Sequence, residues 1–384
     1  MSEDPLSNKC KLMFFVYIFG QGGAERIILN ILNHIDNTKY DIYLVLGEKS
    51  DKNQYLSYLS NRNVKISYLN VPLGQYDQAI NSLAQKINQI NPDILFTEAK
   101  YTNSIAFHAK KLSNNNHTKL IFREAVNRSA CHDENLMQKI KTSFHYNFGP
   151  QRIICISNGV ASDLINHYGI RRRKITIIHN PADLTFIKEK ASEPISNRVF
   201  NKIKGKKIIT IGRLSPSKNQ KLLLEAFNKI KKNNVSLIIL GSGELEADLK
   251  AYCKENQIRN VYFLGNVPNP YQFLKASDLF VLSSIREGFG NVIVEAMATG
   301  TPVISTDCPS GPKEIIGDNK FGLLVPINNA DALSSTILKM LDSPKLMHQY
   351  SNLGKKRSQD FNIDNVIKSY EKVIDEVYSG KRKD

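Results

Sequence analysis

The chain has 384 residues, which is too many for one ordinary domain and enough for two that each bury a core. Its 41% hydrophobic and 23% charged residues are close to globular averages and exclude a wholly disordered chain. The net charge of +16 is unusual. It favours anionic partners, such as phosphorylated ligands, an acidic membrane surface or nucleic acid, without selecting one of them.

Cysteine usage and hydropathy indicate a reducing, cytoplasmic compartment. The five cysteines lie far apart and include no C-x-x-C pair, so they suggest neither a disulfide framework nor a zinc site. The apolar run 12–19 leads into glycines without a small-residue cleavage signal, and we interpret it as a buried strand rather than a signal peptide. No apolar run approaches the length that spans a bilayer, so any membrane contact is expected to be peripheral.

The first half of the chain alternates between strand and helix patterns. Strands are expected at 12–19, 40–46, 64–69, 93–97, 119–123, 152–157 and 174–179, and helices at 27–35, 54–60, 77–90, 103–112, 134–144 and 159–167. This alternation indicates a parallel sheet covered by helices on both faces. A doubly wound domain is therefore predicted for residues 1–182.

A polar segment, 183–204, interrupts the pattern and is expected to be a linker. Alternation resumes with strands at 207–211, 235–240, 261–264, 279–283, 302–305 and 322–325, and with helices or helical turns at 219–231, 244–255, 270–276, 312–316, 330–341 and 345–360. A second doubly wound domain is thus predicted for 205–360, and a final helix with a basic tail for 361–384. Ligands are expected in a cleft between the domains, at the carboxyl ends of their strands.

Two glutamates mark a predicted anion site in the second domain. Glu287 precedes an expected helix start at 289–291, and Glu295 follows about one turn inside that helix. A glycine-containing turn into a helix presents unpaired backbone N–H groups that favour an anion such as a diphosphate. Carboxylates beside such an anion can accept hydrogen bonds from the hydroxyls of a sugar and of a ribose. The pair predicts a sugar-nucleotide pocket, although either glutamate alone could merely suit the helix dipole.

Two cations precede this pocket in the same domain. Arg213 and Lys218 follow the strand 207–211, at the carboxyl edge of the sheet, where they could neutralise a leaving diphosphate. Taken alone, these two residues are typical of solvated loop cations. We assign them to the diphosphate because the same domain contains the two glutamates. The earlier glycine cluster 20–23 is not the G-x-G-x-x-G dinucleotide fingerprint.

These motifs resemble those of the retaining glycosyltransferases of family 4, which have the GT-B fold. The resemblance covers nearly the whole chain and rests on Gly212-Arg213-Leu214 with Lys218-Asn219, Glu287-Gly288-Phe289-Gly290 with Glu295, Gly300-Thr301-Pro302-Val303, and the first loop Gly22-Gly23-Ala24-Glu25. Glu287 and Glu295 correspond to the E-x7-E motif of the family. The resemblance implies an α/β GT-B fold of two Rossmann-like domains facing a central cleft, with the last helix crossing back to the N-terminal domain.

The resemblance also implies a mechanism and its residues. A UDP- or GDP-sugar donor is expected in the C-terminal domain and the acceptor in the N-terminal domain. Catalysis is assigned to Glu287 at the donor sugar and to Arg213 and Lys218 at the diphosphate, acting by positioning and charge stabilisation. Glu295 would bind the ribose, and the loops at Gly290, Asn291 and Val292 and at Gly22 and Gly23 would approach the phosphates. The chain has no Asp-x-Asp, so neither a metal nor a further cofactor is expected.

One departure from the family concerns the acceptor side. Some relatives carry a His followed by an acid after an N-terminal-domain strand, facing the reacting sugar. Here the loop reads Phe122-Arg123-Glu124, which makes Arg123 and Glu124 candidates for contact with the acceptor. A salt bridge between the two at a strand end is the structural alternative.

Two basic segments are candidates for docking on anionic lipid. One is the run 171–174, and the other contains Lys139, Lys141, Phe144, Tyr146 and Phe148. Such segments are more often solvated surface. The resemblance favours lipid, since many family members act on polyprenyl-diphosphate-linked or lipid A-linked acceptors.

The predicted function is transfer of a hexose or N-acetylhexosamine to a growing lipid-linked oligosaccharide, as in O-antigen, capsule or lipopolysaccharide biosynthesis. The protein is expected in the cytoplasm, peripherally on the inner membrane surface. The alternative is a catalytically inactive partner or sugar-nucleotide-binding subunit with the same fold. Nucleic-acid binding rests on charge alone, and no nucleic-acid partner is expected.

Overall fold

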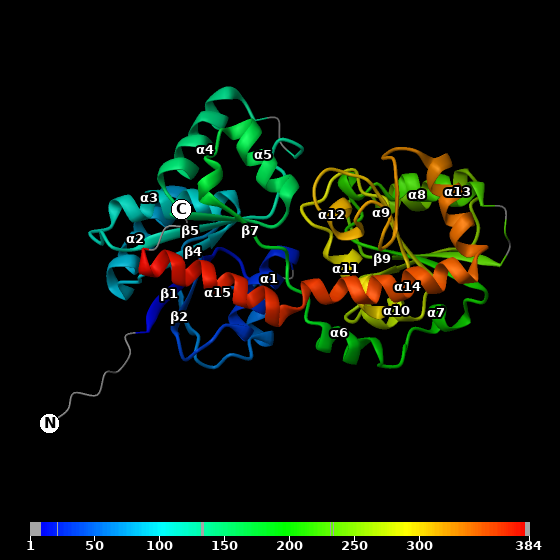
Figure 1. Ribbon diagram of the computed structural model, residues 1–384, viewed down its shortest axis with the longest axis horizontal. Coiled ribbons are helices and arrows are strands. Elements are labelled where there is room, and N and C mark those ends of the chain that lie inside the picture. Colours follow the sequence, from blue (N-terminus) through cyan, green and yellow to red (C-terminus); the bar gives the residue numbers. More distant parts are fainter. Residues whose placement is uncertain (1–8, 21, 132–133, 231, 233, 381–384) are drawn as a thin grey trace. The chain divides into compact units, whose positions relative to one another are not determined.

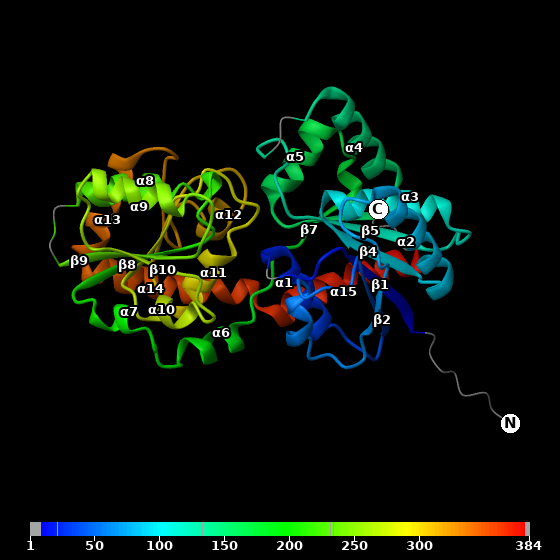
Figure 2. The ribbon, with the colours of Figure 1, turned by 180° about the vertical axis from the view of Figure 1, so that it is seen from behind.

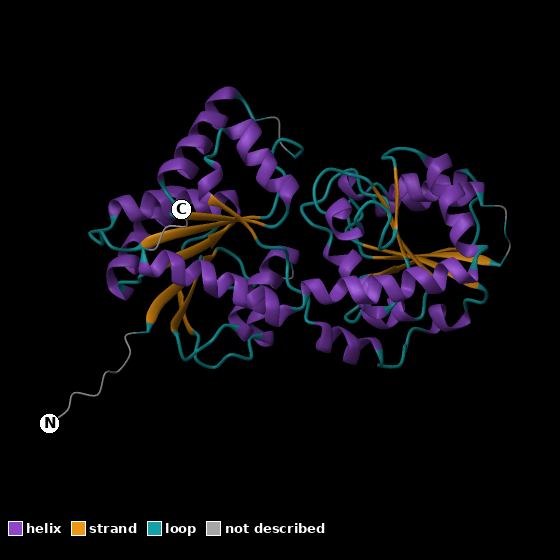
Figure 3. Ribbon diagram, in the orientation of Figure 1, coloured by secondary structure: helices purple, strands orange, loops and turns teal. Residues whose placement is uncertain are grey.

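The computed structural model describes residues 9–20, 22–131, 134–230, 232 and 234–380. The predicted basic tail, 381–384, lies outside the described residues. The chain divides into two compact units: one extends to Pro181 and resumes at Ile363, and the other comprises Ala182–Asn362. In each unit the strands gather in the middle and helices lie on both sides of them (Figure 3). Each is therefore a doubly wound α/β unit.

The described part of the first unit contains a parallel seven-stranded sheet in the order β3-β2-β1-β4-β5-β6-β7. The strands are β1 (Cys10–Val16), β2 (Tyr40–Leu46), β3 (Lys65–Tyr68), β4 (Ile94–Glu98), β5 (Lys119–Glu124), β6 (Arg152–Cys155) and β7 (Ile175–Ile177). The strand order reverses between β1 and β4, where Leu12 pairs with Ile94. That reversal is the topological switch point, beside which open α/β sheets bind ligands.

Helices cover both faces of this sheet (Figures 1 and 2). They are α1 (Gly23–His34), α2 (Tyr76–Ile90), α3 (Ala99–Leu112), α4 (Leu136–Phe148), α5 (Asn158–Tyr168) and α15 (Ile363–Ser379), with 3-10 turns η1 (Gln54–Tyr58) and η2 (Arg172–Lys174). The apolar residues of α15 recur at helical spacing and join the core formed by β1, β2 and α1. The final helix belongs to the first unit, as predicted.

The described part of the second unit contains a parallel six-stranded sheet in the order β10-β9-β8-β11-β12-β13. The strands are β8 (Lys206–Ile211), β9 (Val235–Leu240), β10 (Val261–Gly265), β11 (Leu279–Leu282), β12 (Val303–Thr306) and β13 (Leu323–Val325). Here the order reverses between β8 and β11, where Ile208 pairs with Leu279. The second switch point therefore lies between the strands that lead into the two predicted donor-binding loops.

The helices of the second unit also lie on both sides of the sheet. They are α6 (Leu184–Ala191), α7 (Arg198–Lys202), α8 (Gln220–Lys229), α9 (Glu246–Glu255), α10 (Tyr271–Lys275), α11 (Asn291–Thr299), α12 (Pro312–Ile316), α13 (Ala330–Leu341) and α14 (Pro344–Ser358), with 3-10 turns η3 (Pro216–Lys218) and η4 (Gln359–Phe361). None of the helices in the described part of the chain combines the length and apolar composition of a bilayer span.

The segment 183–204 differs from the expected linker, because it forms α6 and α7 as part of the second unit. Asp183 and Asn197 cap these helices by accepting backbone N–H groups through their side chains. Phe200 is buried and its ring lies 5.0 Å from that of Phe273 on α10. A few well-placed apolar residues thus fold a segment whose polar composition suggested a solvated connection.

Candidate functional site

The predicted donor residues Lys218 and Glu287 meet at the switch point of the second unit. Lys218 ends the turn η3 after β8, and Glu287 lies in the loop after β11. Lys218 Nζ is 2.6 Å from Glu287 Oε1. The same carboxylate oxygen accepts a hydrogen bond of 2.6 Å from Ser284 Oγ. Two donors from different strand ends therefore fix the Glu287 carboxylate at the carboxyl edge of the sheet.

Hydrogen bonds to backbone carbonyls hold the two loops together. Ser283 Oγ donates to the Lys218 carbonyl at 3.0 Å, and the Ile285 amide donates to the Ser217 carbonyl at 2.9 Å. Thr306 Oγ1, at the end of β12, donates to the Ser284 carbonyl at 2.5 Å. The side chains of Lys218 and Glu287 remain 25% and 9% exposed. The pair is thus positioned by its surroundings and is still partly open to solvent.

Helix α11 begins beside Glu287. Gly290 precedes it with a φ of +97°, a left-handed conformation that glycine adopts without the strain of a side chain. The first turn contains Asn291 and Val292, and Glu295 follows one turn later, half-buried. The first N–H groups of a helix have no carbonyl partner within it. The predicted amide cradle and the second glutamate therefore lie on one short helix.

The loop after β12 packs tightly against this helix start. A Cβ at Gly311 would lie 1.9 Å from the Phe289 carbonyl oxygen, so only glycine fits there. The Glu287 amide also faces the Pro309 carbonyl at 3.5 Å. This loop supports the Glu287 loop from the side, which the sequence pattern did not indicate.

Arg213 lies exposed in the loop after β8. Its carbonyl accepts a hydrogen bond of 2.9 Å from Gln220 Nε2. The next residue, Leu214, donates its amide to the Ser242 carbonyl at 2.9 Å, and a Cβ at Gly243 would lie 2.3 Å from the Leu214 carbonyl oxygen. The Gly-Ser-Gly loop after β9 therefore packs against the Arg213 loop. This second loop was not predicted from the sequence, although its two glycines after a strand could have indicated a close backbone approach.

The predicted glycines Gly22 and Gly23 lie in the first unit, where Gly22 caps α1. The Gly22 carbonyl accepts the Arg26 amide at 3.1 Å, and its φ of −75° is open to any residue. A Cβ at Gly22 would lie 1.9 Å from Oε2 of the Glu25 side chain, whereas one at Gly23 would meet nothing within 4 Å. The backbone itself does not require glycine here. Close approach of a ligand remains the predicted reason for these two residues.

The candidate acceptor residues Arg123 and Glu124 are buried, with exposed fractions of 0% and 2%. They do not form the salt bridge offered as the structural alternative. Arg123 pairs with Glu98, whereas Glu124 pairs with Arg128. Successive residues of a strand point to opposite faces of the sheet, which explains the separate partners. Both side chains are thus engaged within the first unit, and contact with an acceptor stays a prediction.

The expectation that Tyr146 lies on a lipid-facing surface is wrong. Tyr146 is 2% exposed, and its hydroxyl donates to Glu124 Oε2 at 2.8 Å. It occupies the inner face of α4, where a phenol can satisfy a buried carboxylate. The outer face exposes a longer apolar series than predicted, formed by Leu136, Met137, Ile140, Phe144 and Phe148.

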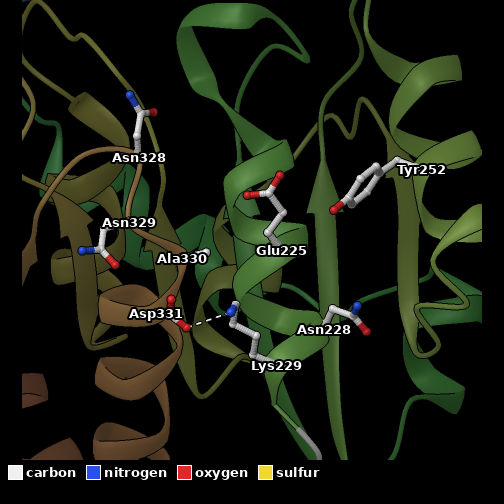
Figure 4. Close-up of a pocket in the computed structure, with 8 residues that line it drawn as sticks. All are labelled: Glu225, Asn228, Lys229, Tyr252, Asn328, Asn329, Ala330 and Asp331. Carbon is white, nitrogen blue, oxygen red and sulfur yellow. Dashed lines mark ion pairs between the residues drawn. The ribbon is translucent and has the colours of Figure 1, made fainter.

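A hollow of about 570 Å³ lies elsewhere on the second unit, between α8, α9 and the start of α13. Its lining is largely polar, and Lys229 Nζ is 2.8 Å from Asp331 Oδ1 across it (Figure 4). It shares no residue with the site around Lys218 and Glu287. Among the described residues, no group of three or more His, Cys, Asp or Glu side chains is arranged to hold a metal ion.

Two family models match the chain. The model described as Glycosyltransferase Family 4 matches residues 21–186, and the model described as Glycosyl transferases group 1 matches residues 192–357. The solved structure of Anabaena Alr3699/HepE in complex with UDP and glucose superposes with a TM-score of 0.81 over 95% of this chain and 99% of that one, at 18% identity. The fold is therefore that of the GT-B glycosyltransferases.

Two curated relatives match over nearly their full lengths. The N-acetylgalactosamine-N,N'-diacetylbacillosaminyl-diphospho-undecaprenol 4-alpha-N-acetylgalactosaminyltransferase of Campylobacter jejuni is 32% identical over 91% of this chain and 95% of the relative. The UDP-Gal:alpha-D-GlcNAc-diphosphoundecaprenol alpha-1,3-galactosyltransferase of Escherichia coli is 28% identical over 92% of each. The chain belongs to glycosyltransferase family 4.

Proposed function

We propose that this chain is a retaining glycosyltransferase that moves a hexose or N-acetylhexosamine from a UDP- or GDP-sugar to a lipid-linked oligosaccharide. The observation that carries the proposal is the contact between Lys218 and Glu287 at the switch point of the second unit, beside the start of α11. The names of the Campylobacter and Escherichia relatives, which act on diphosphoundecaprenol-linked sugars, support the acceptor class.

Each side chain at the site has a role in this proposal. Glu287, held by Lys218 and Ser284, accepts hydrogen bonds from hydroxyls of the donor sugar. Glu295 accepts hydrogen bonds from the ribose hydroxyls. Lys218 and Arg213 stabilise the negative charge that develops on the departing diphosphate, together with the first amides of α11. Because Lys218 lies in direct contact with Glu287, one cation can contact both the diphosphate and the carboxylate that binds the donor sugar.

The reaction proceeds by front-face attack in this proposal. The bond between the anomeric carbon and the diphosphate oxygen breaks, and the acceptor oxygen forms its bond on the same face of the sugar. The proton of the acceptor hydroxyl passes to the departing phosphate, so atoms and charge balance without an enzyme nucleophile. The protein contributes positioning and charge stabilisation, both of which are large terms in a desolvated site.

Radiolabelled transfer tests this proposal. The full chain is incubated with a panel of UDP- and GDP-sugars and a membrane extract, and labelled lipid is extracted. We expect one donor to label the lipid fraction, and Glu287→Gln to slow that labelling about 100-fold or more without loss of folding. A folded chain that binds a sugar nucleotide and transfers none of the panel would support the inactive-subunit alternative instead.

We further propose that the outer face of α4 contacts the anionic cytoplasmic surface of the inner membrane. Leu136, Ile140, Phe144 and Phe148 follow one another at intervals of four, which places them on one side of the helix, and they are 47–74% exposed. The capping box between Asn135 and Gln138 fixes the start of this helix.

Cations flank this apolar series. Lys111 Nζ lies 5.2 Å from the ring centre of Phe144, and the Arg171 guanidinium lies 5.7 Å from that of Phe148. The basic run 171–174 and the aromatic face of α4 are therefore one surface. Aromatic residues bordered by cations suit the boundary between acyl chains and anionic headgroups.

Vesicle cosedimentation tests the membrane contact. The chain should pellet with vesicles containing anionic lipid and much less with neutral ones. Ile140→Ser combined with Phe148→Ser should reduce binding, whereas Val199→Ser, an exposed apolar residue of α7, should not. Equal binding of both variants would place the membrane contact elsewhere or remove it.

A further inference from the structure

A second hollow, of about 220 Å³, lies in the first unit and shares no residue with the site around Lys218 and Glu287. It opens at the carboxyl ends of β1 and β4, the two strands between which the strand order reverses. Its volume equals that of about seven water molecules at roughly 30 Å³ each, which is the scale of one sugar ring and too small for a nucleotide. The position is the one at which doubly wound sheets bind ligands.

The backbone beside this hollow is strained. Ala99 has a φ of +72°, in the left-handed region that alanine rarely adopts. This conformation lets α3 begin directly after β4, so that Glu98 stands at the very end of its strand. Strained non-glycine residues concentrate at ligand sites, where the surroundings hold them.

Two carboxyl groups from different elements line the hollow, Glu98 at the end of β4 and Glu25 at the start of α1. Arg123 pairs with Glu98 and also donates to Tyr370 Oη at 3.0 Å and to Asn180 Oδ1 at 2.5 Å. Burial raises the pKa of Glu98 to about 7 and raises that of Glu25. Ionised carboxylates repel phosphates, whereas a carboxyl group binds hydroxyls in either protonation state.

Aromatic rings belong to the same lining. Tyr17 and Tyr101 both line the hollow, with ring centres 5.2 Å apart and their planes at 66°. The Tyr17 hydroxyl donates to the Pro72 carbonyl at 2.9 Å, which fixes its ring. Aromatic rings and carboxyl groups that line one hollow match a sugar ring, whose faces are apolar and whose rim carries hydroxyls.

We propose that this hollow binds one uncharged sugar ring of the acceptor glycan, with Glu25 and Glu98 hydrogen-bonded to its hydroxyls and Tyr17 and Tyr101 against its apolar face. The inference rests on the proposed function, since it names where that function recognises its acceptor. Arg123 is then a positioning residue that holds Glu98, which gives this departure from the family pattern a physical role without direct contact with the substrate.

Binding of methyl glycosides tests the inference apart from catalysis. Saturation-transfer NMR is recorded on the full chain with methyl glycosides of hexoses and N-acetylhexosamines, in the presence of saturating UDP. We expect at least one glycoside to bind. Glu25→Gln and Ala24→Leu, which adds bulk to the lining, should each weaken its binding about tenfold or more while UDP affinity changes less than twofold. Glu98→Gln is the less informative variant, because it also disturbs a buried ion pair.

Asp77→Asn, a carboxylate-to-amide change at an exposed position of the same unit, is the matched control and should bind as the wild type does. Unchanged glycoside binding in both Glu25→Gln and Ala24→Leu would overturn the inference, as would a wild-type chain that binds none of the glycosides. Glycoside binding that depends on Glu25 in a chain with no transferase activity would instead contradict the proposed function and leave the hollow as a sugar site.

Discussion

Arg123 on β5 donates a hydrogen bond of 3.0 Å from Nε to the hydroxyl of Tyr370 on α15, 247 residues later in the chain. The same guanidinium donates to Asn180, which directly precedes the last residue of the first unit before the chain enters the second. One buried cation therefore joins the segment that leaves the first unit to the helix that returns to it.

This contact predicts a stability effect. Tyr370→Phe removes one hydrogen bond to a buried charge and should lower the free energy of unfolding of the first unit by about 1.5–3 kcal/mol. Arg123→Leu should have a larger effect, about 3–5 kcal/mol, because it leaves Glu98 buried without its partner. Urea unfolding measures both. Tyr378→Phe, at a 40% exposed position of the same helix, is the control. Equal stabilities of the two Tyr→Phe variants would refute the role of Arg123.

The contact between Lys218 and Glu287 predicts an effect on donor binding. Lys218→Met should weaken UDP binding at least about tenfold, or ~1.4 kcal/mol, because it removes a cation from the diphosphate position. Ser284→Ala should weaken binding of the sugar nucleotide more than that of UDP, since Ser284 orients only the Glu287 carboxylate. Isothermal titration measures both affinities. Lys221→Met, on the exposed side of α8, should leave them unchanged.

The close packing at Gly311 predicts a loss of both stability and activity. Gly311→Ala places a methyl group 1.9 Å from the Phe289 carbonyl and forces the two loops apart, with an expected cost of about 1–3 kcal/mol in unfolding free energy. Gly23→Ala meets nothing within 4 Å and should leave thermal stability unchanged. Thermal unfolding checks this contrast, and the transfer rate of Gly311→Ala is compared with that of the wild type alone. A Gly311→Ala protein as stable as the wild type would show that the loops tolerate the added group.

His145 predicts an acid sensitivity of the first unit. Burial, followed by the nearby His108, lowers the pKa of His145 to about 4. The folded pKa thus lies below the ~6.5 of an unfolded histidine, so the stabilisation is fully present above about pH 6.5 and is lost as the pH falls toward 4. His145→Phe keeps the stacking on Phe107, whose ring centre lies 4.4 Å away, and removes the titrating group.

Melting temperatures of the wild type and His145→Phe, compared between pH 7 and pH 5, check that stability falls with pH because of His145. The wild type should lose more stability on acidification than the variant does. His117→Asn, at an exposed position of the same unit, should follow the wild type. Parallel losses in the wild type and in His145→Phe would assign the acid sensitivity to other groups.

The fold was predictable because the apolar residues of each strand and helix recur at the spacing typical of that element. The strands at Tyr40–Leu46 and Val235–Leu240 and the helix at Ala330–Leu341 occupy the predicted residues. The linker prediction for 183–204 was wrong because the two helices there depend on two caps, Asp183 and Asn197, and on packing contacts rather than on composition. Local periodicity does not report such tertiary support.

The donor loops were predictable from residue types, whereas their supports were not. Lys218 and Glu287 lie 69 residues apart, and their contact follows from the pairing of β8 with β11, which periodicity does not reveal. Ser284 and Gly311 act through close packing, for which a single sequence gives little signal. Arg123 and Tyr146 carry polar groups that the fold buries, and only the three-dimensional partners show why.

The most direct test of the account is transfer of a labelled sugar from its nucleotide donor to a lipid-linked acceptor, with the anomeric configuration of the product read by NMR. We expect the wild type to form a product that keeps the configuration of the donor, and Glu287→Gln to slow the reaction about 100-fold or more while remaining folded. A product of inverted configuration, or an equal rate in the variant, would contradict the central claim that Glu287 and Lys218 form the donor site of a retaining transferase.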